Sequence, residues 1–184
     1  MTDLSRRYFA RYPITVPAHS VARIAGLNIR AQAAKYFSGR MLEIGCGTKA
    51  KGLLVGDFIL QHIGLDLPET PHDQTAIDIF GTAYQIPLND ASCDCVLSTA
   101  VIEHLEEPYL ALCEAFRVLK PGGYSIYTAP LFWHLHEEPR DFYRYTRHGL
   151  KYLFEKAGFQ IIDYRIGLRK LNSHIGLFDH FSFH

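Results

Sequence analysis

The sequence predicts an α/β fold: a Rossmann-like, doubly wound sheet of six to seven mostly parallel strands with flanking helices. Six short apolar runs follow one another along the chain, each of strand length and each bounded by Gly, Pro, Asn or Asp. Helical patterns stand between the later runs, and strands that alternate with helices indicate βαβ units. A glycine-containing turn follows the first run, where sheets of this kind bind their ligands.

The six apolar runs are the predicted strands. In order they are Met41 to Gly45, His62 to Leu67, Ala76 to Phe80, Cys93 to Thr99, Tyr124 to Pro130 and Phe159 to Ile166. A helix is predicted from Pro108 to Leu119, ended by Pro121-Gly122-Gly123. Thr146 is expected to cap a further helix that stops at Gly158.

A chain of 184 residues, 48% of them hydrophobic, suits one substantial core and is short for two domains. We expect a single domain (1–184) that comprises an N-terminal arm and helix (1–37), a core (38–167) and an abbreviated C-terminal tail (168–184). The helix of the first part is predicted from about His19 to Phe37.

The tail leaves little room for a final strand, although His180 to Phe183 has the length of a short one. Three possibilities follow: the sheet is abbreviated, the tail completes the sheet of a partner subunit, or the chain is a fragment. Exposed apolar surface at that sheet edge would favour a homodimer.

Charge and cysteine content exclude several classes of protein. Lys plus Arg equals Asp plus Glu at 19 each, so the basic excess typical of nucleic-acid or membrane-surface binding is absent. No secretory signal and no run of roughly 18 apolar residues is present. We therefore expect a cytoplasmic protein with a small-molecule substrate and with no nucleic acid or membrane partner. Reduced, packed thiols are predicted for Cys46, Cys93, Cys95 and Cys113.

The turn after the first predicted strand has the composition of a cofactor-binding loop. Gly45 and Gly47 let the backbone turn sharply and lie against a bound molecule, because a Cβ at either position would project into it. Asp66 lies at the end of the second predicted strand, 21 residues after Gly45 and so near the roughly 20-residue offset at which a carboxylate receives ribose hydroxyls. Together these residues predict a nucleoside site.

Two cofactor classes fit this loop. Residues 45–50 also match the dinucleotide fingerprint Gly-x-Gly-x-x-Ala, which indicates an NAD-dependent oxidoreductase. Glu43 argues against a pyrophosphate, since a carboxylate is a poor neighbour for phosphates and a suitable acceptor for a cationic amino-acid group. Lys49 suits a phosphate, yet no long glycine-to-helix cradle surrounds it.

Four motifs connect the chain with a known family. They are LEIGCGTKAKG, GLDL, GTAYQIPLNDASCDCVLSTAVIEHLEEP and EAFRVLKPGGYSIYTAP. With these motifs in this order, residues 38–167 resemble the class I S-adenosylmethionine (SAM)-dependent methyltransferases. The resemblance implies an enzyme with SAM as its cofactor and disfavours the oxidoreductase.

The resemblance also implies which residues hold SAM. The implied cofactor-binding residues are Glu43, Gly45, Cys46, Gly47, Asp66, Leu67, Thr82, Ala83, Ser98, Thr99 and Ala100. Thr82 stands where the family often has an aspartate that accepts from adenine, and its neutral hydrogen bond is worth only about 1 kcal/mol net. This substitution and the short tail leave open a SAM-binding protein without catalysis. His104 has two open roles, a structural hydrogen bond or a ligand contact.

The segment after the fifth predicted strand is dense in functional groups. It resembles a methyltransferase subgroup with the motif His-x-Glu-Pro-x-Asp-Phe-Tyr-Arg-Tyr-Thr, some members of which are encoded among glycan-biosynthesis genes. Because it leaves the carboxyl end of a strand, we expect it to form the acceptor pocket. The candidate acceptor-binding residues are Trp133, Tyr143, Arg144 and Tyr145.

Histidines in this segment are candidate bases for methyl transfer to oxygen or nitrogen of a small molecule, with a sugar or glycan precursor as one acceptor. An unperturbed imidazole titrates near pH 6.5, which suits a hydroxyl or amine acceptor. His134 or His136 is the candidate catalytic base, with Glu137 or Asp141 as its orienting partner. Alternatively, Asp141 and Arg144 pair and anchor the loop. No metal site is predicted here or at Cys93-Asp94-Cys95, whose two sulfurs we expect on one side of a strand.

Overall fold

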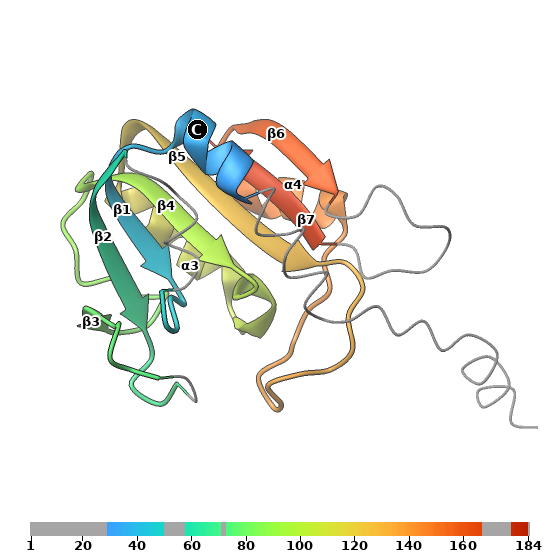
Figure 1. Cartoon of the computed structure of the whole chain (residues 1–184). Coiled ribbons are helices and arrows are strands. Elements are labelled where there is room, and N and C mark those ends of the chain that lie inside the picture. Colours follow the sequence, from blue (N-terminus) through green and yellow to red (C-terminus); the bar gives the residue numbers. More distant parts are fainter. Residues whose placement is uncertain (1–28, 50–57, 71–72, 167–177, 184) are drawn as a thin grey trace, which may run out of the picture.

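A computed structural model describes residues 29–49, 58–70, 73–166 and 178–183. Its strands form one sheet in the order β3-β2-β1-β4-β5-β7-β6, in which β7 alone runs antiparallel to its neighbours (Figure 1). The predicted mostly parallel sheet with flanking helices is thereby confirmed. The described residues contain no helix with both the length and the apolar character of a membrane span.

The elements lie close to their predicted places. The strands are β1 (Gly39–Ile44), β2 (Ile59–Asp66), β3 (Ile79–Phe80), β4 (Cys93–Thr99), β5 (Leu119–Pro130), β6 (Ile161–Ile166) and β7 (Phe178–Phe183). The helices are the 3₁₀ turn η2 (Ile102–His104), α3 (Pro108–Val118) and α4 (Arg147–Lys156), with a further helical segment at residues 29–36. Thr146 caps α4 as predicted, since its hydroxyl accepts the N–H of Gly149 (3.1 Å). The predicted helical residues 19–28 lie outside the described part.

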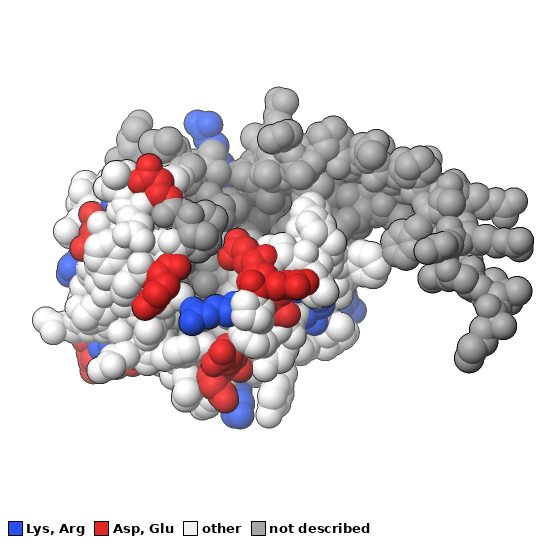
Figure 2. All heavy atoms as spheres, turned by 90° about the horizontal axis from the view of Figure 1, so that it is seen from below, with Lys and Arg blue, Asp and Glu red and all other residues white. Residues whose placement is uncertain are grey.

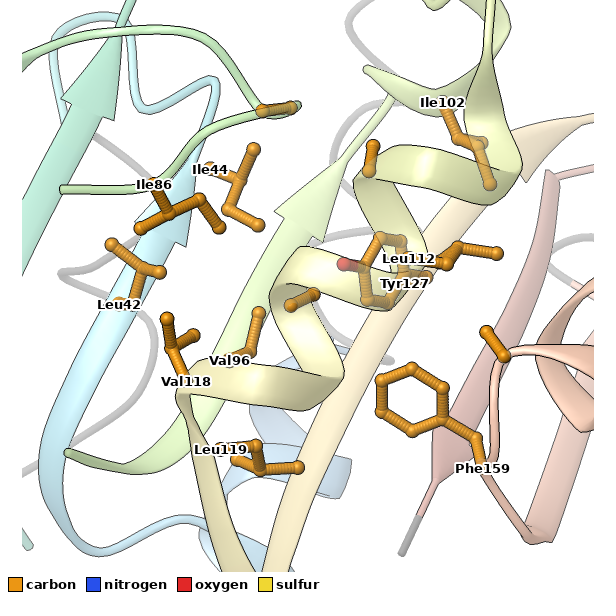
Figure 3. Packing of buried hydrophobic residues seen from close by; sticks show 14 of the residues in the cluster. Leu42, Ile44, Ile86, Val96, Ile102, Leu112, Val118, Leu119, Tyr127 and Phe159 are labelled. Atoms are coloured by element: carbon orange, nitrogen blue, oxygen red, sulfur yellow. The ribbon is translucent and has the colours of Figure 1, made fainter. Parts of the chain in front are cut away.

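Helices cover both faces of the sheet because its strands alternate apolar side chains between them. On one face, α3 and α4 pack on β1, β4 and β5 through a cluster that includes Leu42, Val96, Leu112, Tyr127 and Phe154. Figure 3 shows the first four of these side chains. On the other face, residues 29–36 contribute to a smaller cluster with Met41, Cys95, Leu97 and Ile126. The core is therefore a three-layer arrangement that leaves the strand ends free for a ligand.

The start of β5 differs from the prediction. Pairing begins at Leu119, opposite Cys93, so the strand runs through Pro121-Gly122-Gly123 instead of starting after it. The register shifts between Cys93 and Cys95, and the shift places Cys93 in the α3 cluster and Cys95 in the opposite cluster. The expectation of both sulfurs on one side was wrong because a register shift breaks the period-two rule. All four cysteines are free, as predicted.

The tail supplies a strand of its own sheet. β7 lies between β5 and β6 and pairs antiparallel with both. A strand from a partner subunit is therefore not required at this position, and the argument from an incomplete sheet edge to a homodimer does not hold.

Candidate active site

The site lies at the carboxyl ends of the parallel strands, where the order of strands along the chain reverses between β1 and β4. A cleft of about 1170 Å³ opens there. Its walls come from the segments that follow β1, β2, β3, β4 and β5. This volume exceeds the roughly 300–1,000 Å³ of most single-ligand pockets. The cleft therefore has room for a nucleoside cofactor together with a small second molecule.

The turn after β1 forms one wall of this cleft, as the glycine pattern predicts. Gly45 and Gly47 have φ values of +67° and +50°, a region that residues with a Cβ rarely adopt. The N–H groups of Gly45 and Cys46 both donate to the carbonyl of Leu65, at 2.9 and 3.2 Å. These bonds hold the turn against β2. Burial raises the pKa of the Cys46 thiol to about 12, so it is protonated at neutral pH.

Gly45→Ala is expected to lower the free energy of unfolding by about 2 kcal/mol or more, because alanine is strained at this φ and its Cβ would overlap Cγ2 of Val101. For a chain of this size the loss corresponds to a fall in Tm of about 4–8 °C. Gly149→Ala is the matched control, since its Cβ meets only Oγ1 of Thr146 at 3.5 Å and the glycine is in α4. Equal Tm values for the two variants would contradict this reading of the turn.

Asp66 ties the ends of β1 and β2 together at the cleft wall. Its Oδ2 accepts the N–H of Gly47 and its Oδ1 accepts the N–H of Leu67, both at 2.8 Å. A carboxylate offers about four acceptor positions, so each oxygen keeps a lone pair for a further donor. The side chain is thus oriented by the backbone toward the position where a ribose is expected.

Most of the predicted cofactor residues line the cleft. They are Gly45, Cys46, Gly47, Asp66, Leu67, Thr82, Ala83, Thr99 and Ala100. Two others do not. Ser98 is buried within β4. Glu43 is fully buried, and its Oε2 lies 2.7 Å from Nε2 of His62 on β2.

The second wall is the segment between β5 and α4, which carries the predicted acceptor residues. Trp133, His136 and Glu137 line the cleft, whereas His134, Tyr143, Arg144 and Tyr145 do not. Tyr145 is buried and donates through its hydroxyl to the carbonyl of Ile102 (3.1 Å). Tyr143 donates to the carbonyl of Glu106 (3.1 Å). These two tyrosines therefore attach the segment to the region after β4.

Asp141 and Arg144 hold the shape of this segment. The guanidinium donates to both carboxylate oxygens of Asp141, at 2.6 and 2.7 Å, and also to the carbonyls of Trp133 (3.2 Å) and His134 (2.9 Å). This guanidinium holds the pKa of the Asp141 carboxyl well below its usual range. The pair thus has the anchoring role that the sequence left open. Asp141 also accepts the backbone N–H of His136 (2.9 Å), which fixes His136 at the cleft.

Several cleft residues were not predicted. Glu69, Tyr84, Val101, Glu106 and Arg140 line it together with His104. Nδ1 of His104 lies 2.5 Å from the carbonyl oxygen of Arg140, and its ring stands edge-on to that of His136 with centroids 4.7 Å apart. His104 therefore combines both roles that the sequence left open, a structural hydrogen bond and a place at the ligand cleft.

Known proteins are similar to part of this sequence and to its fold. Residues 42–127 match a family described as "Methyltransferase domain". A probable S-adenosylmethionine-dependent methyltransferase of Mycolicibacterium smegmatis is 38% identical over 96 residues, which cover 49% of this chain and 37% of that protein. An uncharacterized methyltransferase of Mycobacterium leprae is 26% identical over 140 residues, 69% of this chain and 52% of its own length. Residues 42–127 are therefore similar to a methyltransferase domain, and the chain spans 37% and 52% of the length of these two relatives.

Solved structures agree with this assignment at the level of fold. A SAM-dependent methyltransferase from Thermotoga maritima, described as a possible histamine N-methyltransferase, superimposes with a TM-score of 0.63 at 24% identity and covers 97% of this chain and 93% of its own. The trans-methyltransferase CalH in complex with SAH gives a TM-score of 0.69 at 12% identity, over 86% of this chain and 54% of its own. SAM is the cofactor that the methyltransferase matches indicate, and the cleft described above has the volume to hold it.

Proposed function

We propose that this methyltransferase transfers the methyl group of SAM to oxygen or nitrogen of a small molecule, with a sugar or glycan precursor as the acceptor. The observation that carries the proposal is one continuous cleft with the glycine turn and Asp66 at one side and Trp133, His136 and Glu137 at the other. Methyl donor and acceptor must meet in line, so a single cavity lined by both sets of residues meets the first requirement of the reaction.

The charge of the cleft supports a cationic cofactor. Its lining includes the carboxylates of Asp66, Glu69, Glu106, Glu137 and Glu138, and the guanidinium of Arg140. Seen from this end of the molecule, several acidic side chains lie on the surface with basic ones between them (Figure 2). SAM carries a sulfonium and an ammonium group, whereas NAD carries a pyrophosphate that this lining would repel. An uncharged sugar is likewise better suited to the cleft than a phosphorylated one.

Residues of this chain position the reactants and take up the acceptor proton. SAM supplies the reactive methyl group, so the protein mainly orients the acceptor and excludes water. Of the candidate bases and partners predicted from the sequence, His136 and Glu137 lie at the cleft, where they can bind and deprotonate a hydroxyl or amine. His134 is a weaker candidate because its ring is exposed and outside the cleft lining.

We propose a small-molecule substrate, no nucleic-acid or membrane partner, and a cytoplasmic location. Four free cysteines, three of them buried, match a reducing compartment. The chain also lacks the excess of Lys and Arg that is typical of nucleic-acid-binding proteins.

Transfer from methyl-labelled SAM into a metabolite extract tests the activity. We expect the intact chain to label a small polar compound, and an Asp66→Ala variant to label much less of it. Calorimetric titration with SAM, its demethylated product and NAD is run beside it. SAM binding without any label across a broad extract would favour a non-catalytic SAM-binding protein, and NAD binding without SAM binding would reject the proposal.

A further inference from the structure

Two histidines and a buried glutamate meet at the acceptor side of the cleft. Glu103 and His104 belong to η2, and His136 lies in the segment after β5. One ligand atom from each of the three lies within 4.8 Å of the others. Glu103 is fully buried, and the side chains of His104 and His136 are 13% and 24% exposed. We propose that these three residues, with Glu137 beside them, bind a divalent transition-metal ion.

The hydrogen bonds of His104 leave its second nitrogen free for a metal. A carbonyl oxygen can only accept, so the 2.5 Å contact with Arg140 means that Nδ1 carries the proton. Nε2 is buried and has no hydrogen-bond partner among the residues that the structure describes. An imidazole that donates one N–H to a backbone carbonyl and directs the other nitrogen inward has the orientation of a metal ligand.

His136 is oriented in the same way. Its Nδ1 lies 3.2 Å from the carbonyl oxygen of His134 and 3.4 Å from Oδ2 of Asp141. Asp141 is itself held by Arg144. A carboxylate and a carbonyl on Nδ1 leave Nε2 as the nitrogen available to a ligand, which is the carboxylate–histidine arrangement behind many metal ligands.

The carboxylates stand at separations that one ion can bridge. Nε2 of His104 lies 4.0 Å from Oε1 of Glu103 and 3.9 Å from Oε2 of Glu137, which is too long for a hydrogen bond. Two ligand atoms that each lie about 2.1 Å from one metal are at most about 4.2 Å apart, so His104 is close enough to share an ion with either carboxylate. Small side-chain rotations would bring the atom of His136 into the same sphere.

The ligand set indicates the class of metal. Two imidazoles and one or two carboxylates suit Zn²⁺, Mn²⁺, Fe²⁺ or Co²⁺, whereas Mg²⁺ and Ca²⁺ prefer sites made of oxygen alone. Glu103 and Glu137 both lie about 4 Å from His104, and the guanidinium of Arg144, which is paired with Asp141, also interacts electrostatically with Glu103. A divalent ion adds the positive charge that this group of carboxylates attracts.

The ion would activate the acceptor for methyl transfer. This role rests on the proposed function, whereas metal binding itself does not. A hydroxyl bound to a divalent ion loses its proton at lower pH, which makes it a better nucleophile. His136 would then be a ligand of the metal and not the base, and Glu137, at the cleft edge, would be a further ligand or take the proton.

Titration of the chelator-treated full chain with Co²⁺ tests the site, since bound Co²⁺ gives a visible absorption spectrum that reports its ligands. We expect one Co²⁺ per chain, displaced by Zn²⁺, and at least a 100-fold loss of affinity in His104→Ala and in His136→Ala. His148→Ala is the matched control, because His148 is exposed on α4, outside the cleft lining, and should leave binding unchanged.

Two results would overturn the proposal: no Co²⁺ spectrum with the unaltered chain, or equal affinities in the unaltered chain and both cleft variants. Measured Tm values show whether a variant is folded, and the two histidines come from different segments, so one unstable variant does not decide the outcome. Calorimetric titration of the metal-free chain with SAM separates this proposal from the previous one. SAM binding without metal binding would refute the metal site and leave methyl transfer standing.

Discussion

Asp66→Ala is expected to weaken SAM binding by at least tenfold, which corresponds to about 1.4 kcal/mol. The carboxylate has two tasks in the structure. It accepts the N–H groups of Gly47 and Leu67, both at 2.8 Å, and it lines the cleft where a ribose would present two hydroxyls. Alanine removes the ribose acceptor and also releases the glycine turn, so both effects lower affinity.

Calorimetric titration with SAM measures this effect, and two further variants locate its cause. Asp66→Asn keeps one acceptor oxygen and is expected to fall between the original chain and Asp66→Ala. Asp73→Ala is the matched control, because Asp73 accepts the N–H of Thr75 (2.8 Å) outside the cleft lining. Unchanged SAM affinity in a folded Asp66→Ala protein would mean that the ribose is not bound at the end of β2.

The sequence predicted the elements of the fold better than their edges. The fourth apolar run predicted β4 with the same bounds as in the structure, because polar residues mark both ends of that run. The start of β5 was missed because Leu119 pairs with Cys93 across a register shift, which no local pattern reveals. Strand pairing across a sheet is set by residues far apart in sequence, so propensity alone places strand ends poorly.

The cofactor side of the site was largely predictable, since its motif lies within short stretches after β1 and β2. Glu43 shows the limit of this reasoning. It precedes the turn by two residues, yet it hydrogen-bonds His62 outside the cleft lining. Its neighbours Leu42 and Ile44 face the α3 cluster, so alternation along β1 turns Glu43 to the other face.

The acceptor side could not be predicted in the same way. The proximity of His104 to His136 depends on how the segment after β5 folds back on η2. Backbone hydrogen bonds help to hold this segment against η2: the N–H groups of Phe142 and Tyr143 both donate to the carbonyl of Glu103, at 2.9 and 3.2 Å. Bonds between backbone atoms carry no signature in side-chain composition, so the histidine pair became visible only in the fold.

Asp141→Ala is expected to lower the free energy of unfolding by about 3 kcal/mol, because it leaves a partly buried guanidinium without its carboxylate. The Asp141 side chain is 1% exposed and that of Arg144 is 23% exposed. The same change frees the backbone of His136, which displaces the acceptor end of the cleft. Misplacement by about 1 Å can cost roughly 100-fold in rate, so methyl transfer should fall by that order while SAM affinity changes little.

The ion pair between Asp141 and Arg144 predicts the direction in which the stability of the chain changes with pH. Arg144 lowers the pKa of Asp141 in the folded chain below the value of about 3.9 of an unperturbed aspartate. A lowered folded pKa means that the stabilisation is fully present above about pH 5 and is lost as the pH falls through the lower folded-state value. Urea unfolding at pH 7 and at successively lower pH should therefore show a stability difference between the original chain and Asp141→Ala that shrinks in acid.

Glu155→Ala is the matched control, since its pair with Lys151 (3.6 Å) is exposed on α4 and is worth at most about 1 kcal/mol. A difference for Asp141→Ala as small as that of the control would show that Asp141 and Arg144 do not anchor the acceptor segment.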